Sequence, residues 1–176
     1  SSISVYGETT TNSRITESTP VDPSTFYGVT KFSGEKVLQI TAQKVGFPLL
    51  ILRCCKVYGP GNADTISYGP DQFINTILKE HRLALFGNGE EKRDYLFIQD
   101  LIDIIRQLAL GETTGTLNLA SGKSFSFKEI SSIFRHIIKG DFNEIISNRE
   151  KPIINEGFNI EMLLNACPDI TFTDLQ

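Results

Sequence analysis

The segment FPLLILRCC, residues 47–55, constrains the fold of this chain more than any other feature. It is an almost continuous apolar run, bounded by Gly46 before it and by the turn signal YGPGN after it. A run that is apolar at successive positions is typical of a strand buried on both faces of a parallel sheet. We therefore expect residues 49–54 to form an interior parallel strand, and the chain to have an α/β fold.

Helix and strand patterns alternate on both sides of this run. A helix is expected to begin near Ser24 or Thr25, either of which could cap it, and to end at Gly46. Further on, helices are predicted at about residues 72–81, 99–110 and 127–138, and strands at LALF, RDYLFI, GTLNLA and EIIS. This alternation again indicates layered α/β architecture.

Composition excludes several classes of protein. The 176 residues, 40% of them hydrophobic, can bury one sizeable core, and a net charge of −4 gives no positive field to attract nucleic acid. No run approaches the roughly 18 apolar residues of a membrane span, and no export signal is recognisable. Cys54, Cys55 and Cys167, with histidine only at 81 and 136, lack metal-ligand spacing. We expect a cytoplasmic protein with no metal site and no membrane or nucleic-acid partner.

The strongest chemical signal is the pair Tyr27 and Lys31 in YGVTK. Four residues apart, they lie on one face of the expected helix. An unperturbed tyrosine has a pKa of about 10, and a neighbouring ammonium favours the phenolate, which brings it toward use as an acid or base. Ser2 lies upstream, where a strand would end, and its hydroxyl could hold a substrate oxygen. The alternative is a surface tyrosine and lysine that only cover apolar side chains.

The context of this pair consists of five ordered blocks: SSISVYG, PSTFYGVTKFSGEK, LLILRCCKVYGPGN, LALFGNGEEKRDYLFIQDL and GTLNLASGKSFSFKEI. With these blocks the chain resembles the NAD-dependent epimerase/dehydratase family, extended short-chain dehydrogenases that act on nucleotide sugars, from Ser1 to about Ile133. The resemblance implies the distal part of a Rossmann-like, doubly wound parallel sheet in residues 1–60. It also implies that residues 61–176 form mainly a small α/β lobe that binds the nucleotide sugar, with a truncated tail.

The resemblance further implies roles for single residues. Tyr27 would be the general base on a sugar hydroxyl while hydride passes to NAD, and Lys31 would bind the nicotinamide ribose and lower the pKa of the tyrosine. Ser2 would hydrogen-bond the reacting oxygen and so contact the substrate. Cys54 would join Tyr27 and Lys31 in binding NAD.

Three more residues are expected to bind the nucleotide sugar. Arg93 matches a family arginine that grips the diphosphate, and Phe86 matches a position near the nucleotide base. Their structural alternatives are an arginine paired with Asp94 or Glu91, and a phenylalanine in the core. Lys56 replaces a family asparagine; it could attract a phosphate but cannot reproduce the donor and acceptor of an amide. Its alternative is a solvated lysine at the end of a strand.

The sequence also departs from the family. It contains no GxxGxxG turn to hold the NAD pyrophosphate, so we expect a truncated form that alone neither binds NAD measurably nor epimerises sugars. Ile3 and Ser4 stand where dehydratases place acidic residues, which favours an epimerase or a reductase. The alternative is a catalytically silent remnant or interaction module. Because family members pair through the helix that carries the tyrosine and lysine, a homodimer through residues 26–45 is expected.

Overall fold

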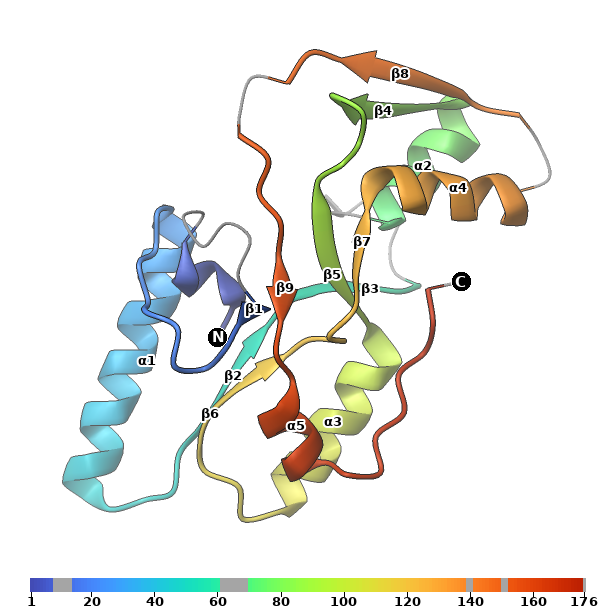
Figure 1. The fold of residues 1–176 in the computed structure, drawn as a ribbon. Coiled ribbons are helices and arrows are strands. Elements are labelled where there is room, and N and C mark those ends of the chain that lie inside the picture. Colours follow the sequence, from blue (N-terminus) through green and yellow to red (C-terminus); the bar gives the residue numbers. More distant parts are fainter. Residues whose placement is uncertain (8–13, 61–69, 139–140, 150–151, 176) are drawn as a thin grey trace.

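A computed structural model describes residues 1–7, 14–60, 70–138, 141–149 and 152–175 (Figure 1). Strands and helices alternate along most of the chain, as expected. The elements, in chain order, are η1 (Ile3–Tyr6), β1 (Arg14–Ile15), α1 (Phe26–Val45), β2 (Leu50–Cys54), β3 (Lys56–Tyr58), α2 (Pro70–Glu80), β4 (Arg82–Phe86), β5 (Lys92–Phe97), α3 (Ile98–Leu110), β6 (Gly115–Leu119), β7 (Ser124–Ser126), α4 (Phe127–Ile137), β8 (Asn143–Ser147), β9 (Gly157–Phe158) and α5 (Glu161–Ala166).

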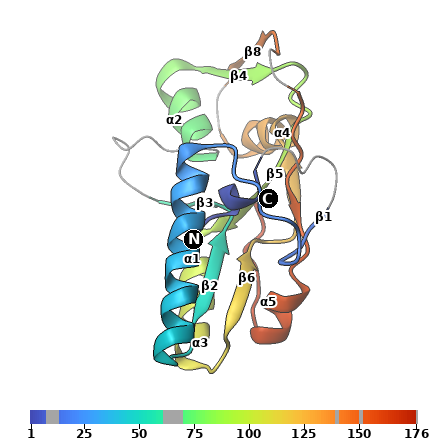
Figure 2. The ribbon, with the colours of Figure 1, turned by 90° about the vertical axis from the view of Figure 1, so that its left-hand side faces the viewer.

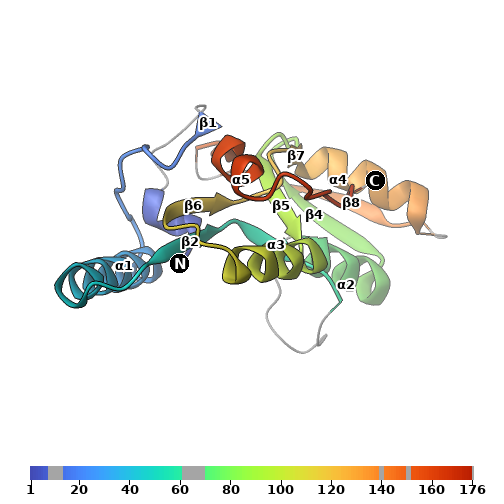
Figure 3. The same ribbon diagram turned by 90° about the horizontal axis from the view of Figure 1, so that it is seen from below.

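The apolar run forms β2, which pairs in parallel with β6 along its whole length. On the other side of β2, Ser2 makes a parallel bridge to Cys54, so the chain entering η1 continues the sheet. α3 and α5 lie on opposite sides of the β2–β6 pair, and α1 runs beside β2 (Figures 2 and 3). The predicted α/β fold with a buried parallel strand is therefore confirmed.

Two further groups of strands follow. β3, β5 and β7 form a three-stranded sheet in which β5 is central, parallel to β3 and antiparallel to β7. β4 pairs in parallel with β8, with α2 and α4 lying nearby in Figure 1. β1 pairs with β9. The strands β1, β3, β7 and β9 were not predicted, because two- or three-residue strands arise from long-range pairing and leave no periodic pattern in the sequence.

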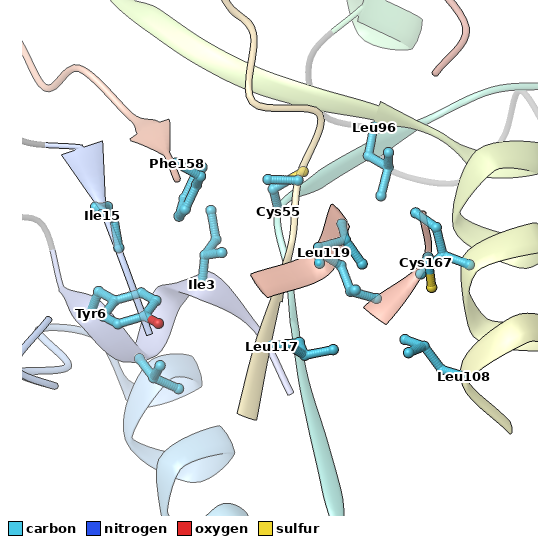
Figure 4. Close-up of a cluster of buried hydrophobic side chains, with 14 residues drawn as sticks. Ile3, Tyr6, Ile15, Cys55, Leu96, Leu108, Leu117, Leu119, Phe158 and Cys167 are labelled. Atoms are coloured by element: carbon cyan, nitrogen blue, oxygen red, sulfur yellow. The ribbon is translucent and has the colours of Figure 1, made fainter. Parts of the chain in front are cut away.

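The buried side chains form two clusters. The first surrounds β2 and β6 and consists of Ile3, Val5, Tyr6, Ile15, Cys55, Leu96, Ile104, Leu108, Leu117, Leu119, Ala120, Phe158, Leu163 and Cys167 (Figure 4). The second surrounds β4 and contains Ile77, Leu83, Leu85, Tyr95, Ile130, Phe134 and Phe142. The first cluster crosses the predicted domain boundary at residue 60, because α3 and β6 return to pack beside β2. The boundary itself stays a prediction.

α1 has the ends that its sequence predicts. The Thr25 hydroxyl accepts a hydrogen bond from the Gly28 amide at 3.0 Å, so Thr25, and not Ser24, is the N-cap. Gly46 ends the helix in the left-handed conformation, with φ of 81°. Within α1 only Gly28 and Glu35 are buried. None of the helices in the described ranges combines the length and apolar character needed to cross a bilayer.

Candidate active site

Tyr27 and Lys31 meet on the surface of α1. The Lys31 Nζ lies 5.4 Å from the centroid of the Tyr27 ring, as expected for side chains one helical turn apart. The Tyr27 side chain is 55% exposed, so its phenol is open to a ligand. The ammonium therefore lies in cation–π range of the Tyr27 ring.

Cys54 and Ser2 lie at the end of β2 that approaches this pair. They are bridged in parallel, and the Ser2 hydroxyl accepts a hydrogen bond from the Ser4 amide at 3.2 Å, capping η1. Burial raises the pKa of the Cys54 thiol, and the positive charges of the Ser1 amine and, to a smaller extent, of Lys31 oppose that rise. Contacts and charge therefore link Tyr27 to Lys31, Lys31 to Cys54, and Cys54 to Ser2. The structure brings these four predicted residues together, while their roles stay predictions.

A buried ion pair that the sequence analysis missed joins α1 to β2. The Arg53 guanidinium donates to both carboxylate oxygens of Glu35, from Nε at 3.0 Å and from Nη2 at 2.8 Å. Glu35 is 3% exposed and Arg53 is 5% exposed. Burial raises the pKa of the Glu35 carboxyl, but hydrogen bonds from Arg53 and Ser1 outweigh it and hold that pKa below its usual value. The available signal was an arginine inside an apolar run, because a buried charge requires a partner.

The same arginine continues into a buried polar network. Its Nη1 donates to the Tyr6 hydroxyl at 2.9 Å, and that hydroxyl donates to Asn118 Oδ1 on β6 at 2.7 Å. Burial raises the pKa of Tyr6, although the bond from Arg53 opposes the rise. Asn118 Nδ2 is the one buried side-chain nitrogen or oxygen of the described residues with no hydrogen-bond partner. The network thus holds the third nitrogen of Arg53, while Glu35 holds the other two.

The cations expected to bind the diphosphate are held by carboxylates. The Lys56 ammonium lies 2.5 Å from Glu156, and Arg93 Nε lies 3.5 Å from the same carboxylate. Arg93 also contacts Glu91, which was one of the two pairings considered for it. Its other considered partner, Asp94, instead accepts hydrogen bonds from Ser121 and Gly122. Arg93 and Lys56 are thus brought together at Glu156.

Lys56 is the first residue of β3, and its side chain is 33% exposed and ion-paired with Glu156. The core alternative for Phe86 is wrong. Strand β4 alternates exposed and buried residues, and Phe86 falls on the exposed side, with 55% of its side chain accessible. Phe86 ends β4, in the part of the molecule built around the second cluster. Its proposed contact with a nucleotide base remains a prediction.

A hollow of about 600 Å³ lies between β2 and α3, lined by Pro48, Leu50, Leu52, Ile105, Leu108, Ala109, Gly111, Glu112, Thr113 and Thr114. None of the predicted site residues lines it, so this hollow is separate from the candidate site. Within the described ranges, no group of three or more His, Cys, Asp and Glu side chains is arranged to hold a metal ion.

Comparison with known proteins identifies the family. Residues 1–120 match the NAD dependent epimerase/dehydratase family, and the chain belongs to that family. An uncharacterized UDP-glucose epimerase of Bacillus subtilis (strain 168), YtcB, is 32% identical over 146 residues, covering 78% of this chain and 43% of that protein. Matched relatives include both epimerases and dehydratases.

Solved structures agree with the fold. The UDP-N-acetylglucosamine 4-epimerase of Methanobrevibacter ruminantium M1, in complex with UDP-N-acetylmuramic acid, has a TM-score of 0.86 at 25% identity over 95% of this chain and 55% of that one. The UDP-glucuronic acid 4-epimerase of Bacillus cereus, in complex with NAD, has a TM-score of 0.83 at 25% identity over 99% of this chain and 55% of that one. The chain thus spans about half the length of the relatives it matches.

Proposed function

We propose that this chain is the part of an NAD-dependent nucleotide-sugar epimerase that carries the proton-transferring residues and contacts with the nucleotide sugar. The observation that carries the proposal is the exposed Tyr27–Lys31 pair beside Cys54 and Ser2. Among the described residues, Lys31 has no carboxylate at ion-pairing distance, whereas Lys56 and Arg93 both do.

The proposed chemistry is proton transfer at a sugar hydroxyl. The Tyr27 phenolate takes the hydroxyl proton, Lys31 stabilises the phenolate by its charge, and the Ser2 hydroxyl hydrogen-bonds the sugar oxygen. When bound, NAD supplies the acceptor and donor of hydride at the sugar carbon. The residues present fit the nicotinamide end of NAD, since the ammonium of Lys31 can donate to ribose hydroxyls and its charge acts on the half-buried Cys54.

The decisive experiment is a chimera in which this chain replaces the matching region of the Bacillus subtilis relative. We expect it to interconvert UDP-glucose and its epimer, measured by chromatography of the nucleotide sugars. A folded chimera that binds UDP-glucose and NAD without turnover would favour the silent interaction module instead. Release of water from the sugar would identify a dehydratase.

The 176-residue chain alone is expected to bind NAD too weakly to measure. Its sequence has no GxxGxxG turn for the pyrophosphate, and a few hydrogen bonds at the ribose do not offset an association cost of at least about 4 kcal/mol. Titration calorimetry of the purified chain with NAD tests this expectation. Saturable micromolar binding would contradict it.

Arg93 is proposed to bind the diphosphate, together with Lys56. Replacing Arg93 by alanine should weaken binding of UDP by roughly 1.5–3 kcal/mol, the range for a hydrogen bond to a charged group, or about 10- to 150-fold. Arg82→Ala is a matched control, because Arg82 forms an exposed ion pair with Glu80 outside the candidate site. Equal affinities of the wild type and Arg93→Ala would remove the diphosphate role.

A homodimer through α1 is proposed as the quaternary arrangement. Val37 and Ile40, on one side of α1, are 63% and 52% exposed, and further apolar side chains of the helix are also exposed. We expect Val37→Lys/Ile40→Lys to shift the sedimentation coefficient from that of a dimer to that of a monomer. A wild-type chain that sediments as a monomer at micromolar concentration would rule this interface out.

A further inference from the structure

We propose that Glu35, Arg53 and Gly28 form a clamp that fixes the rotation of α1 about its axis, and thereby turns Lys31 and Tyr27 toward Cys54 and Ser2. Glu35 and Arg53 are then positioning residues, which act through Lys31 and Tyr27 and do not touch the substrate. The catalytic consequence rests on the proposed function. The placement itself rests on geometry.

The two buried residues of the clamp lie on one side of α1, and the reactive pair flanks that side. Tyr27, Lys31 and Glu35 are spaced by four residues, so each side chain is a surface neighbour of the next. Gly28 and Glu35, seven residues apart, occupy the same side two turns apart, and Lys31 lies between them. A rotation of the helix that moved Lys31 away from β2 would have to move both buried residues as well.

Each end of the clamp makes a contact that depends on direction. At Gly28, an added Cβ would lie 2.4 Å from the Ser4 carbonyl oxygen, so the helix backbone approaches η1 as closely as glycine allows. At Glu35, the two parallel bonds from Arg53 hold the carboxylate in the plane of the guanidinium. The Ser1 hydroxyl donates a further bond to the same carboxylate at 2.6 Å.

Arg53 also transmits position to the strand. It directly precedes Cys54, the residue whose thiol is affected by the charge of Lys31. Because the Tyr6 hydroxyl holds its third nitrogen, the guanidinium cannot follow a shifting Glu35 without breaking the bond to Tyr6. The contacts of Arg53 therefore fix the position of α1 relative to β2, and with it the position of Lys31.

Apolar packing supplies only part of this constraint, through Phe32, which is partly buried against the first cluster. The other large apolar side chains of α1 are exposed, so no continuous apolar stripe selects one rotation. A buried ion pair adds little net stability compared with apolar residues of similar size. Its contribution here is to select one orientation.

The test uses the Cys54 thiol of the full chain as a reporter for the position of Lys31. Cys54 is half-buried, whereas Cys55 and Cys167 are buried, so alkylation by iodoacetamide can be followed at Cys54 by mass spectrometry across a pH series. The charged groups acting on this thiol are the amine of Ser1 and, to a smaller extent, Lys31; because Ser1 also bonds to Glu35, the Lys31→Met background separates the two. The variant Lys31→Met shows how much the charge of Lys31 contributes to the reactivity of Cys54. We expect this variant to be alkylated two- to tenfold more slowly at neutral pH, because less Cys54 thiolate is present.

The informative variant is Glu35→Leu/Arg53→Met. It removes a net-neutral pair and leaves no unpaired buried charge, so the fold is expected to survive. We expect the pH dependence of Cys54 alkylation in this variant to match that of Lys31→Met. Adding Lys31→Met to the double variant should then cause no further change. Glu80→Gln/Arg82→Gln removes an exposed pair of the same charges and should leave the profile unchanged.

A wild-type Cys54 profile in the folded double variant would overturn the clamp. If that variant does not fold, Gly28→Ala is measured instead; its added Cβ would lie 2.4 Å from the Ser4 carbonyl oxygen and must displace the helix, so an unchanged profile there has the same meaning. No substrate or coenzyme is present, so the result does not depend on turnover. In the active chimera, the double variant should lower kcat with little change in KM; a displaced Lys31 with unchanged kcat would count against Tyr27 as the base.

Discussion

α1 and α3 lie beside the same β2–β6 pair, and they are held by opposite kinds of contact. α3 buries Asp100, Ile104 and Leu108 at four-residue spacing and thereby presents a largely apolar stripe to the first cluster. α1 buries a glycine and an ion-paired glutamate, and exposes most of its apolar side chains. Apolar burial stabilises a helix but specifies its rotation only through shape, whereas hydrogen bonds specify direction. The comparison shows that α3 mainly contributes stability, whereas α1 mainly presents the reactive groups.

The largest expected effect tests the reactive side of this comparison. Tyr27→Phe in the chimera should lower turnover by about a hundredfold to ten-thousandfold, the usual loss for a general base, and leave UDP-glucose affinity nearly unchanged. The melting temperature should hardly move, because the Tyr27 side chain is 55% exposed. Undiminished turnover would show that another group removes the proton.

The second prediction tests the stabilising side. Ile104→Ala in α3 should cost roughly 2–5 kcal/mol of unfolding free energy, because the side chain is fully buried and leaves a cavity. Val37→Ala in α1, whose side chain is 63% exposed, should stay within about 0.5 kcal/mol. Urea denaturation of the two variants measures both. A large loss at Val37 would mean that a second copy covers α1 in solution.

A smaller effect is expected at the beginning of α1. Thr25→Ala removes the bond to the Gly28 amide and should cost about 1 kcal/mol, while Thr25→Ser should restore most of it. The N-cap residue of α3, Phe97, makes no side-chain cap bond, so α3 has no equivalent bond to lose. If Thr25→Ala were as stable as the wild type, the start of α1 would be held by other contacts.

The smallest expected effect is a pH dependence of the clamp. The pKa of Glu35 is lower in the folded chain than its ordinary value of 4.5, so the carboxylate contributes stability that is complete above about pH 4.5. This contribution is lost as the pH falls through the lower folded pKa, by at most about 1.4 kcal/mol per pH unit. The stability difference between the wild type and Glu35→Gln should therefore narrow on acidification below pH 4.5. A constant difference between pH 5 and 3 would contradict this.

Local signals explain which parts of the structure could be predicted. The limits of α1 follow from Thr25 and Gly46, and the juxtaposition of Tyr27 and Lys31 follows from helix periodicity. The partner of Arg53 could not be predicted from local pattern. Glu35 lies 18 residues earlier, and only the packing of α1 on β2 brings the two together.

The same limit applies to the second group of predicted residues. Arg93 and Lys56 carry a charge that suits a diphosphate, but nothing near them in sequence indicates Glu156, which is 100 residues from Lys56. β9 follows directly after Glu156 and pairs with β1, and this pairing helps to bring the carboxylate to both cations. Long-range topology, and not residue type, therefore decides how these cations are neutralised.

The central strand β5 gives the two hydrophobic clusters a common element. Its successive residues Tyr95 and Leu96 point to opposite faces, and they enter the second and the first cluster respectively. A slip of one residue in β5 would exchange these faces and disrupt both clusters at once. If β5 unfolds, both clusters lose buried side chains at the same time. The described chain is therefore expected to unfold in one cooperative transition.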